Sequence, residues 1–215
     1  MTAPAIRPYR PADRVAVRKI CCDTASQGEP IETIFPDREF MADALMNYYT
    51  DHEPESLRVA ELDGRVVGYC AGCVDTRRYV RVWIARVLPR VLWLLIAHGH
   101  LVRPNSWRVL TAWIGMGRRQ SADRPGIIEQ YPAHCHVNVQ PGLQRGGIGS
   151  LLLNAFLDQL KLRRVPGIHV STMSEQGKAF FGKAGMQMLA RYPGPKISGH
   201  AASEVWFMGM KLGAP

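Results

Sequence analysis

The residues of greatest chemical interest run from position 137 to position 150 and read VNVQPGLQRGGIGS. A strand-like segment ends there, a glycine-rich turn follows, and an amphipathic helix begins. Glycines allow the backbone to approach a ligand closely, and the unpaired N–H groups at a helix start bind phosphate oxygens. Arg145 adds a guanidinium that contacts phosphate with two donors. These residue types in this order predict a phosphate or pyrophosphate site.

The turn differs from the familiar nucleotide-binding loops. No Lys-Ser/Thr pair closes it, as in a Walker loop, and its spacing does not match G-x-G-x-x-G in a first strand–helix–strand unit. A glycine-rich turn without any ligand is the alternative.

Candidate proton-transfer groups precede this turn in the sequence. His134 and His136 lie on the strand-like segment before it, and a neutral imidazole suits proton transfer near pH 7. Both are an odd number of residues from Val139, so without a bulge they face the opposite side of the strand. Asp75 ends an earlier strand-like segment. The alternatives are a hydrogen-bonded core histidine and a salt bridge from Asp75 to Arg77 or Arg78.

Five cysteines include the pair Cys70 and Cys73 in a C-x-x-C spacing. No second pair completes a zinc site, and the pair lies within a strand-like run rather than at a helix start. We therefore expect buried thiols, no disulfide framework and no metal site.

Strand and helix periodicities alternate along the chain, and Asp63-Gly64 is a strong hairpin signal between two strands. Residues 115–132 are predicted to form a loop. The expected strands are 5–9, 57–62, 65–74, 133–139, 167–172, 186–192 and 204–212, and the expected helices are 11–24, 37–49, 76–98 with a break at Pro89, 106–114, 147–162 and 174–184. This order predicts an α/β (α+β) fold in which helices flank a mixed, twisted sheet of about seven strands, in one domain spanning residues 1–215.

The net charge of +9 comes mainly from one quarter of the chain, because residues 75–124 hold ten arginines and two aspartates. Four tryptophans lie in the same segment, at positions 83, 93, 107 and 113. Such a surface suits an acidic partner, a membrane surface, a homodimer contact or a lid over a site, and a solvated face is the plainer alternative. Nucleic acid is not expected, since no nucleic-acid module is recognisable.

Gln144-x-x-Gly147-x-Gly149 resembles the acyl-CoA pyrophosphate signature of the GNAT superfamily, Q/R-x-x-G-x-G/A. The stretch from Ser174 to Met186 is similar to the next helix of that superfamily, N-x-x-A-x-x-L-Y-x-x-x-G-F, and the expected strand order agrees. The resemblance covers nearly the whole chain except residues 76–131, a basic helical insertion between strands three and four.

This resemblance implies acetyl-CoA as co-substrate. It assigns the pantetheine arm to the backbone of Val137 and Val139, and to Ser174 unless Ser174 only caps its helix. It assigns the pyrophosphate to the loop residues Gln144, Arg145, Gly146, Gly147, Ile148, Gly149 and Ser150.

The same resemblance implies an N-acetyltransferase acting on an amine of a small molecule, peptide or protein. Phe181 stands where the superfamily usually has a tyrosine acid, so a weak or inactive acetyl-CoA-binding protein is the alternative. Asp75 and His136 are the predicted catalytic residues. Without a signal peptide or a membrane-length apolar run, the expected location is cytoplasmic.

A narrower resemblance rests on the stretches 6–13, 68–72, 75–77 and 133–138. They are similar to the acetyltransferase-like domain fused to O-GlcNAc hydrolases and its stand-alone bacterial relatives.

Overall fold

The computed structural model describes residues 3–26, 28–103, 106–107, 109–112, 114–115, 124–194 and 204–213. Its strands are β1 (Ala5–Pro8), β2 (Leu57–Leu62), β3 (Arg65–Cys73), β4 (Ala133–Val139), β5 (Gly167–Thr172), β6 (Gln187–Pro193) and β7 (Glu204–Lys211). Its α-helices are α1 (Arg14–Thr24), α2 (Arg38–Asp51), α3 (Thr76–Val82), α4 (Leu88–Ala97), α6 (Arg124–Gln130), α7 (Ile148–Leu162) and α8 (Glu175–Lys183).

The seven strands form one sheet in the order β1-β2-β3-β4-β5-β7-β6. Only β4 and β5 run parallel, and every other neighbouring pair is antiparallel. The predicted mixed sheet of seven strands is therefore confirmed. Asp63 and Gly64 both have positive φ, 49° and 73°, as a two-residue hairpin turn between β2 and β3 requires.

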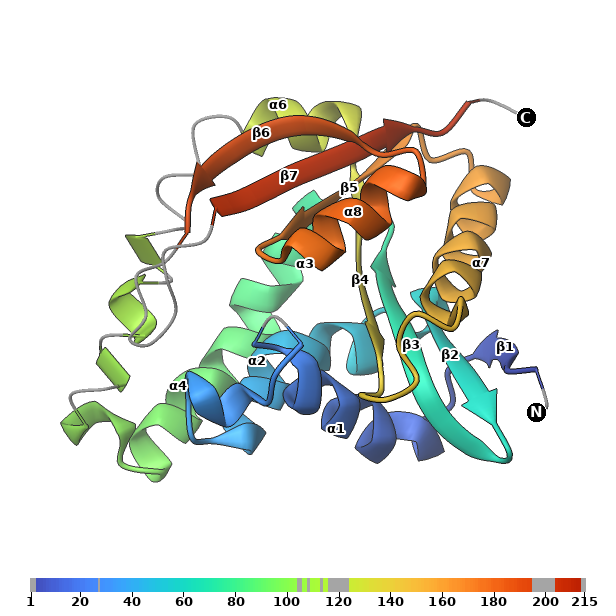
Figure 1. Cartoon of the computed structure of the whole chain (residues 1–215). Coiled ribbons are helices and arrows are strands. Elements are labelled where there is room, and N and C mark those ends of the chain that lie inside the picture. The colour runs from blue at the N-terminus through green and yellow to red at the C-terminus, as the bar shows by residue number, and fades with distance from the viewer. Residues whose placement is uncertain are drawn as a thin grey trace.

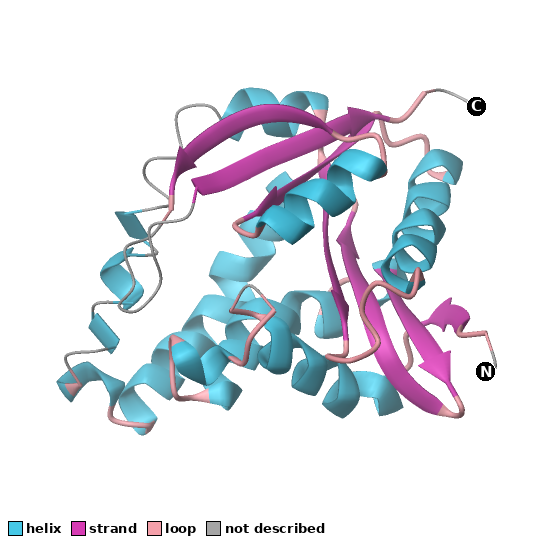
Figure 2. Cartoon of the chain, viewed as in Figure 1, coloured by secondary structure: helices cyan, strands magenta, loops and turns pink. Residues whose placement is uncertain are grey.

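Helices cover both faces of this sheet (Figures 1 and 2). On one face α1 and α2 pack against β3, and on the other α7 packs against β2, β3 and β4. The alternation of side chains along β3 supplies both layers, so Cys70 belongs to the core under α7 and Cys73 to the core under α1 and α2. The two thiols of the C-x-x-C thus lie on opposite faces, and all five cysteines are free and buried.

The helices between β3 and β4 dock onto α2. Trp83 Nε1 donates to the carbonyl of Ala44 at 3.0 Å, and Arg90 pairs with Asp43 at 3.0 Å. The predicted break at Pro89 is wrong, because the chain passes from α3 through a π-helical turn, η4 (Trp83–Val87), directly into α4. Pro89 falls in the first turn of α4, where its missing N–H costs little.

The loop predicted over residues 115–132 is also wrong in its second half, where α6 forms. Its second residue is Pro125, and proline suits the first turn of a helix as well as it suits a loop. Residues 116–123 of this predicted loop lie outside the described part of the chain.

The outer face of α3, η4 and α4 combines apolar and basic side chains. The exposed apolar residues include Ile84, Trp93 and Ile96, and Arg77, Arg78 and Arg81 are exposed as well. That this face binds a second copy of the chain, an acidic partner or a membrane surface remains a prediction. Among the described helices, none has the length and apolar character needed to cross a bilayer.

Candidate active site

The parallel strands β4 and β5 separate soon after they begin. They pair only at Ala133 with Ile168 and at His134 with His169. Beyond these two pairs β4 continues to Val139 beside β3 alone, and β5 continues beside β7. Figure 1 shows β5, β6 and β7 diverging from β2, β3 and β4. This divergence leaves one edge of β4 without a neighbouring strand.

The hydrogen-bond pattern of β4 determines which backbone groups face that edge. Gln140 N donates to Val67 O at 2.8 Å, which marks a hydrogen-bonded pair with β3. Because such pairs alternate in an antiparallel ladder, the backbone groups of Val137 and Val139 point away from β3 and toward β5. Gln144 Nε2 indeed reaches the carbonyl of Val139 from this side, at 3.2 Å. An extended ligand could therefore hydrogen-bond to β4 like an added strand.

The glycine-rich turn joins β4 to α7 through left-handed backbone conformations. Gly142, Arg145 and Gly147 have φ of 86°, 66° and 83°, and Gly147 is the N-cap of α7. The first intrahelical acceptor, Gly147 O, receives the N–H of Leu151 at 3.1 Å. The preceding N–H groups, from Ile148 to Ser150, therefore have no partner within the helix and carry the positive end of its dipole.

The predicted phosphate residues surround this helix start. Gln144, Arg145, Gly146 and Gly147 are exposed, and Ile148 turns its side chain into the core. A side chain at Gly149 would meet the Phe180 ring of α8 at 3.4 Å and Val137 Cγ1 at 3.8 Å. Glycine there keeps the start of α7 close to both β4 and α8. These groups suit a pyrophosphate next to an extended arm along β4.

Ser174 is the N-cap of α8, and its hydroxyl oxygen accepts from Gly177 N at 3.0 Å. The cap is close-packed, because a Cβ at Gly177 would lie 2.3 Å from Thr172 Oγ1. Ser174 thus caps its helix, and whether it also contacts the pantetheine arm stays a prediction.

Phe181 of α8 belongs to the core cluster that also holds residues of the sheet and α7, and only 7% of its surface is exposed. Its ring contacts that of Phe180, with centroids 4.9 Å apart. A phenyl group has no proton to give a leaving group, so this position of α8 provides no acid.

Comparison with known proteins identifies the family. No family model matches the sequence. The crystal structure of SsHAT matches with 30% sequence identity and a TM-score of 0.76, covering 99% of this chain and 100% of that chain. The chain belongs to the GNAT superfamily of acetyltransferases. SsHAT is a stand-alone bacterial relative of the O-GlcNAc hydrolase acetyltransferase domain, so the narrower resemblance is confirmed as well.

Two more distant GNAT structures share the fold. The protein yncA from Salmonella typhimurium, solved with its cofactor acetyl-CoA, is 15% identical with a TM-score of 0.60, over 100% of this chain and 96% of that chain. Polyamine N-acetyltransferase from Drosophila melanogaster is 12% identical with a TM-score of 0.61, over 98% and 100% of the two chains.

The two histidines of β4, which lie near the point where β4 and β5 separate, have different roles. His134 is buried, with Nε2 2.8 Å from Tyr49 Oη and Nδ1 2.7 Å from Thr76 Oγ1. The Thr76 hydroxyl has a single proton and donates it to Pro132 O at 2.7 Å. His134 therefore donates from Nδ1 to Thr76 and accepts from Tyr49 at Nε2. It is the hydrogen-bonded core histidine that was one alternative for this pair.

His136 is exposed and forms no hydrogen bond within the described residues, so its imidazole is available to a substrate. Its ring stands edge-on to that of Tyr49, with centroids 5.7 Å apart. Solvent reaches part of the ring, yet the surrounding protein atoms disfavour the imidazolium and lower the pKa of His136 to about 4. A charge on His169 acts in the same direction. The imidazole is thus neutral at physiological pH.

Asp75 is the N-cap of α3 and not an ion-pair partner of the arginines that follow it in sequence. One carboxylate oxygen accepts from Arg77 N at 2.8 Å and from Arg78 N at 3.2 Å. These bonds occupy Oδ1, and a catalytic role for Asp75 stays a prediction.

The sequence pattern did not single out Tyr79 as part of the site. Its ring stacks on Tyr49 at 5.8 Å and meets His134 edge-on at 4.8 Å, so it packs in the same aromatic cluster as the buried histidine. The one available signal is its position one helical turn after Asp75. Tyr49 is fully buried, which raises its pKa far above the ordinary range.

Proposed function

We propose that this GNAT protein transfers an acetyl group from acetyl-CoA to an amine, with the co-substrate lying along the free edge of β4. The proposal rests on one observation above all. β4 parts from β5 after two residue pairs, with the backbone groups of Val137 and Val139 facing the gap and the positive end of α7 close by. The pantetheine amides would pair with Val137 and Val139, and Arg145 with the α7 N–H groups would hold the pyrophosphate.

In this proposal, His136 is the proton acceptor. The amine nitrogen forms a bond to the thioester carbonyl carbon, the carbon–sulfur bond breaks, and the amine proton passes to the His136 imidazole and on to water. A backbone N–H on the free edge of β4 donates a hydrogen bond to the thioester carbonyl oxygen and so polarises the carbonyl. Because Phe181 has no exchangeable proton, the leaving sulfur takes its proton from water.

The acceptors of two proteins of similar structure suggest which amines to test first. Polyamine N-acetyltransferase and agmatine N-acetyltransferase both act on amines by name. An amine of a small molecule, peptide or protein is the proposed acceptor class here, and a panel should include polyamines, agmatine and peptides with free amino groups.

The central test measures thiol release from acetyl-CoA by purified protein across that panel, together with calorimetric binding of acetyl-CoA. We expect His136→Gln to lower kcat by about 10²-fold or more and to leave acetyl-CoA affinity unchanged, because the base acts only in transfer. His52→Gln is the matched control, a partly exposed histidine at the C-cap of α2. Unchanged kcat in His136→Gln would remove His136 from the mechanism.

The pH dependence follows from the pKa of about 4 for His136. The base is the neutral form, which predominates above that pKa. After correction for protonation of the amine, we expect the rate to stay level from pH 9 to about 6 and to fall only as pH approaches 4. A fall centred near pH 6.5, the usual value for histidine, would contradict this assignment.

A second function, acetyl-CoA binding without turnover, is favoured by Phe181. Its ring is buried where the superfamily usually has a tyrosine. Tight acetyl-CoA binding without thiol release on any amine of the panel would support this second function over the first.

A further inference from the structure

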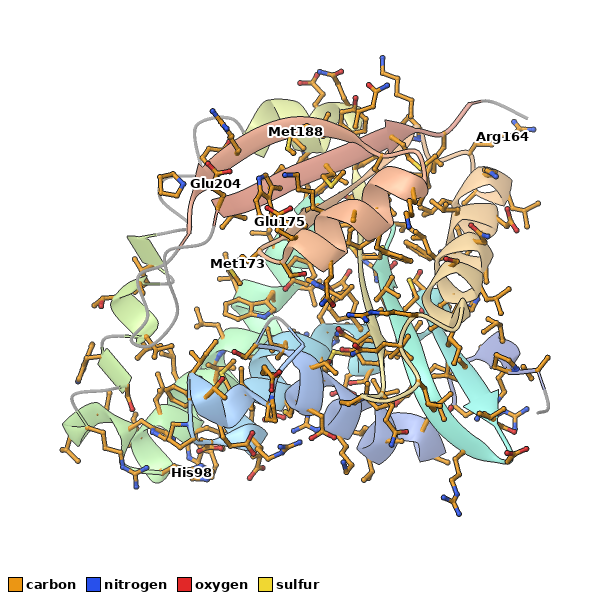
Figure 3. All side chains as sticks on the ribbon, viewed as in Figure 1. His98, Arg164, Met173, Glu175, Met188 and Glu204 are labelled. Carbon is orange, nitrogen blue, oxygen red and sulfur yellow. The ribbon has the colours of Figure 1, made fainter. Side chains whose placement is uncertain are left out.

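A carboxylate and two imidazoles converge outside the proposed acetyl-CoA site. Asp37 Oδ2 lies 2.5 Å from His98 Nδ1 and 2.8 Å from His100 Nε2. The three donor atoms all lie within 4.8 Å of one another. Asp37 is the N-cap of α2, His98 is the C-cap of α4, and His100 begins η5 (His100–Val102). Figure 3 labels His98 at the end of α4, far from Glu175 at the start of α8.

The surroundings orient each donor. Asp37 Oδ1 accepts from Phe40 N at 2.9 Å, which fixes the carboxylate and turns Oδ2 toward the histidines. His100 Nδ1 lies 3.2 Å from Ser106 Oγ, so Ser106 can accept its N–H and leave Nε2 as a lone-pair donor. Metal-binding histidines and carboxylates commonly have such outer partners.

Burial and access differ between the two histidines in a way that suits a bound ion. His100 is 1% exposed, and its ring contacts the Phe35 and Phe40 rings at centroid distances of 4.8 and 5.9 Å. The His98 side chain is 35% exposed, which leaves an entry path and room for a water ligand. An apolar wall on one side and solvent on the other is a common setting for a metal with three protein ligands.

We propose that Asp37, His98 and His100 bind one Zn²⁺ ion, with water as the fourth ligand. Two imidazole nitrogens and one carboxylate oxygen form a donor set that zinc accepts readily. As the ion enters, each ring nitrogen that now hydrogen-bonds to Oδ2 must present a lone pair, so its proton moves to the other ring nitrogen or, from an imidazolium, to water. Zinc ligands at about 2.0–2.1 Å stand about 3.3 Å apart in a tetrahedron, so Asp37 Oδ2 must lie about 0.5 Å farther from His100 Nε2 and about 0.8 Å farther from His98 Nδ1.

The consequence is structural. The ion would fasten the end of α4 and η5 to the first turn of α2, and with them the basic segment between β3 and β4. This inference is independent of acetyl transfer, since none of its residues belongs to the proposed acetyl-CoA site.

The test titrates ZnCl₂ into untagged, chelator-treated full-length protein and measures binding by calorimetry. We expect one Zn²⁺ per chain, with affinity that rises with pH because binding releases protons. His98→Gln removes a partly exposed ligand at a helix end. Asp37→Asn removes the anionic ligand and keeps a good helix cap. Each should weaken zinc binding by at least 10-fold, whereas His52→Gln should not change it.

Thermal unfolding gives a second readout. Zinc should raise the Tm of the wild type and of His52→Gln, and at the same zinc concentration it should raise the Tm of His98→Gln and Asp37→Asn by clearly less. Absence of zinc binding by the wild type would overturn the proposal and leave a metal-free hydrogen-bonded cluster. Equal zinc affinity in wild type and both cluster variants would overturn it as well. Acetyl-CoA binding is measured on the same samples, so failure of the zinc site is distinguishable from failure of the proposed function.

Discussion

Two arginines, Arg145 and Arg164, have the same unusual backbone conformation. Comparing their variants distinguishes an effect on ligand binding from an effect on stability. Arg145 has φ of 66° in the glycine-rich turn, and Arg164 has φ of 55° after the end of α7. Both side chains are exposed. A left-handed conformation costs a side-chain-bearing residue about 1–2 kcal/mol, which glycine largely avoids. At Arg145 the strained conformation occurs at a residue whose guanidinium is proposed to bind the pyrophosphate.

We therefore expect Arg145→Gly and Arg164→Gly each to raise the free energy of unfolding, by about 0.5–1 kcal/mol after the entropy cost of glycine. Only Arg145→Gly should weaken acetyl-CoA binding, by about tenfold or more, because it loses charge-assisted hydrogen bonds. Denaturant unfolding and calorimetry measure the two effects. An equal loss of affinity in Arg164→Gly would mean that Arg145 makes no specific contact with the pyrophosphate.

The packing of α7 on the sheet depends on a glycine in β3. A Cβ at Gly72 would lie 2.2 Å from Cε2 of Phe156, whose ring is fully buried between α7 and the sheet. No real Cβ contact is this short, so the ring or the helix would have to move. Because α7 also carries the proposed phosphate-binding N-terminus, this contact links the core to the site.

Gly72→Ala should lower the free energy of unfolding by about 1–3 kcal/mol, the usual cost of an overpacked core. Adding Phe156→Leu to Gly72→Ala should recover part of this loss, so the two changes should not be additive. Gly126→Ala, at a helical glycine with open space around it, should be neutral or stabilising. Full additivity of the double variant would show that Phe156 is not the obstacle.

At the scale of the whole molecule, the sheet consists of two parts that share little direct pairing. β4 and β5 contribute two residue pairs, whereas β3 and β4 contribute six and β5 and β7 also six. A ligand between β4 and β5 would add hydrogen bonds at the weakest point of the sheet. Binding and stability should therefore be coupled more strongly there than elsewhere.

Acetyl-CoA at about 100 times its Kd should raise the free energy of unfolding by about 2.7 kcal/mol. Amide hydrogen exchange should slow most at Val137 and Val139 and in the first turn of α7, because those N–H groups gain partners. The Arg145→Gly variant at the same ligand concentration should show a smaller effect. Protection confined to α3 and α4 would contradict the proposed binding mode.

The sequence alone determined the elements whose signals are local. The bounds of β2, β4 and β5 match their predictions, and the Asp63-Gly64 turn has the positive φ values that its residue types favour. These features depend on side-chain alternation and turn chemistry within a few residues. The glycine-rich turn between β4 and α7 was predictable for the same reason, and with it the family.

Only the tertiary structure decided which groups meet. His134 and His136 have the same residue type and face of β4, yet their partners differ. Tyr49 and Thr76 hydrogen-bond to His134, whereas among the described residues His136 has only ring contacts, such as that with Tyr49. Asp37 meets His98 and His100 across more than sixty residues, which no local spacing reveals. Burial, strand register and long-range packing set these contacts, and with them the chemistry of each side chain.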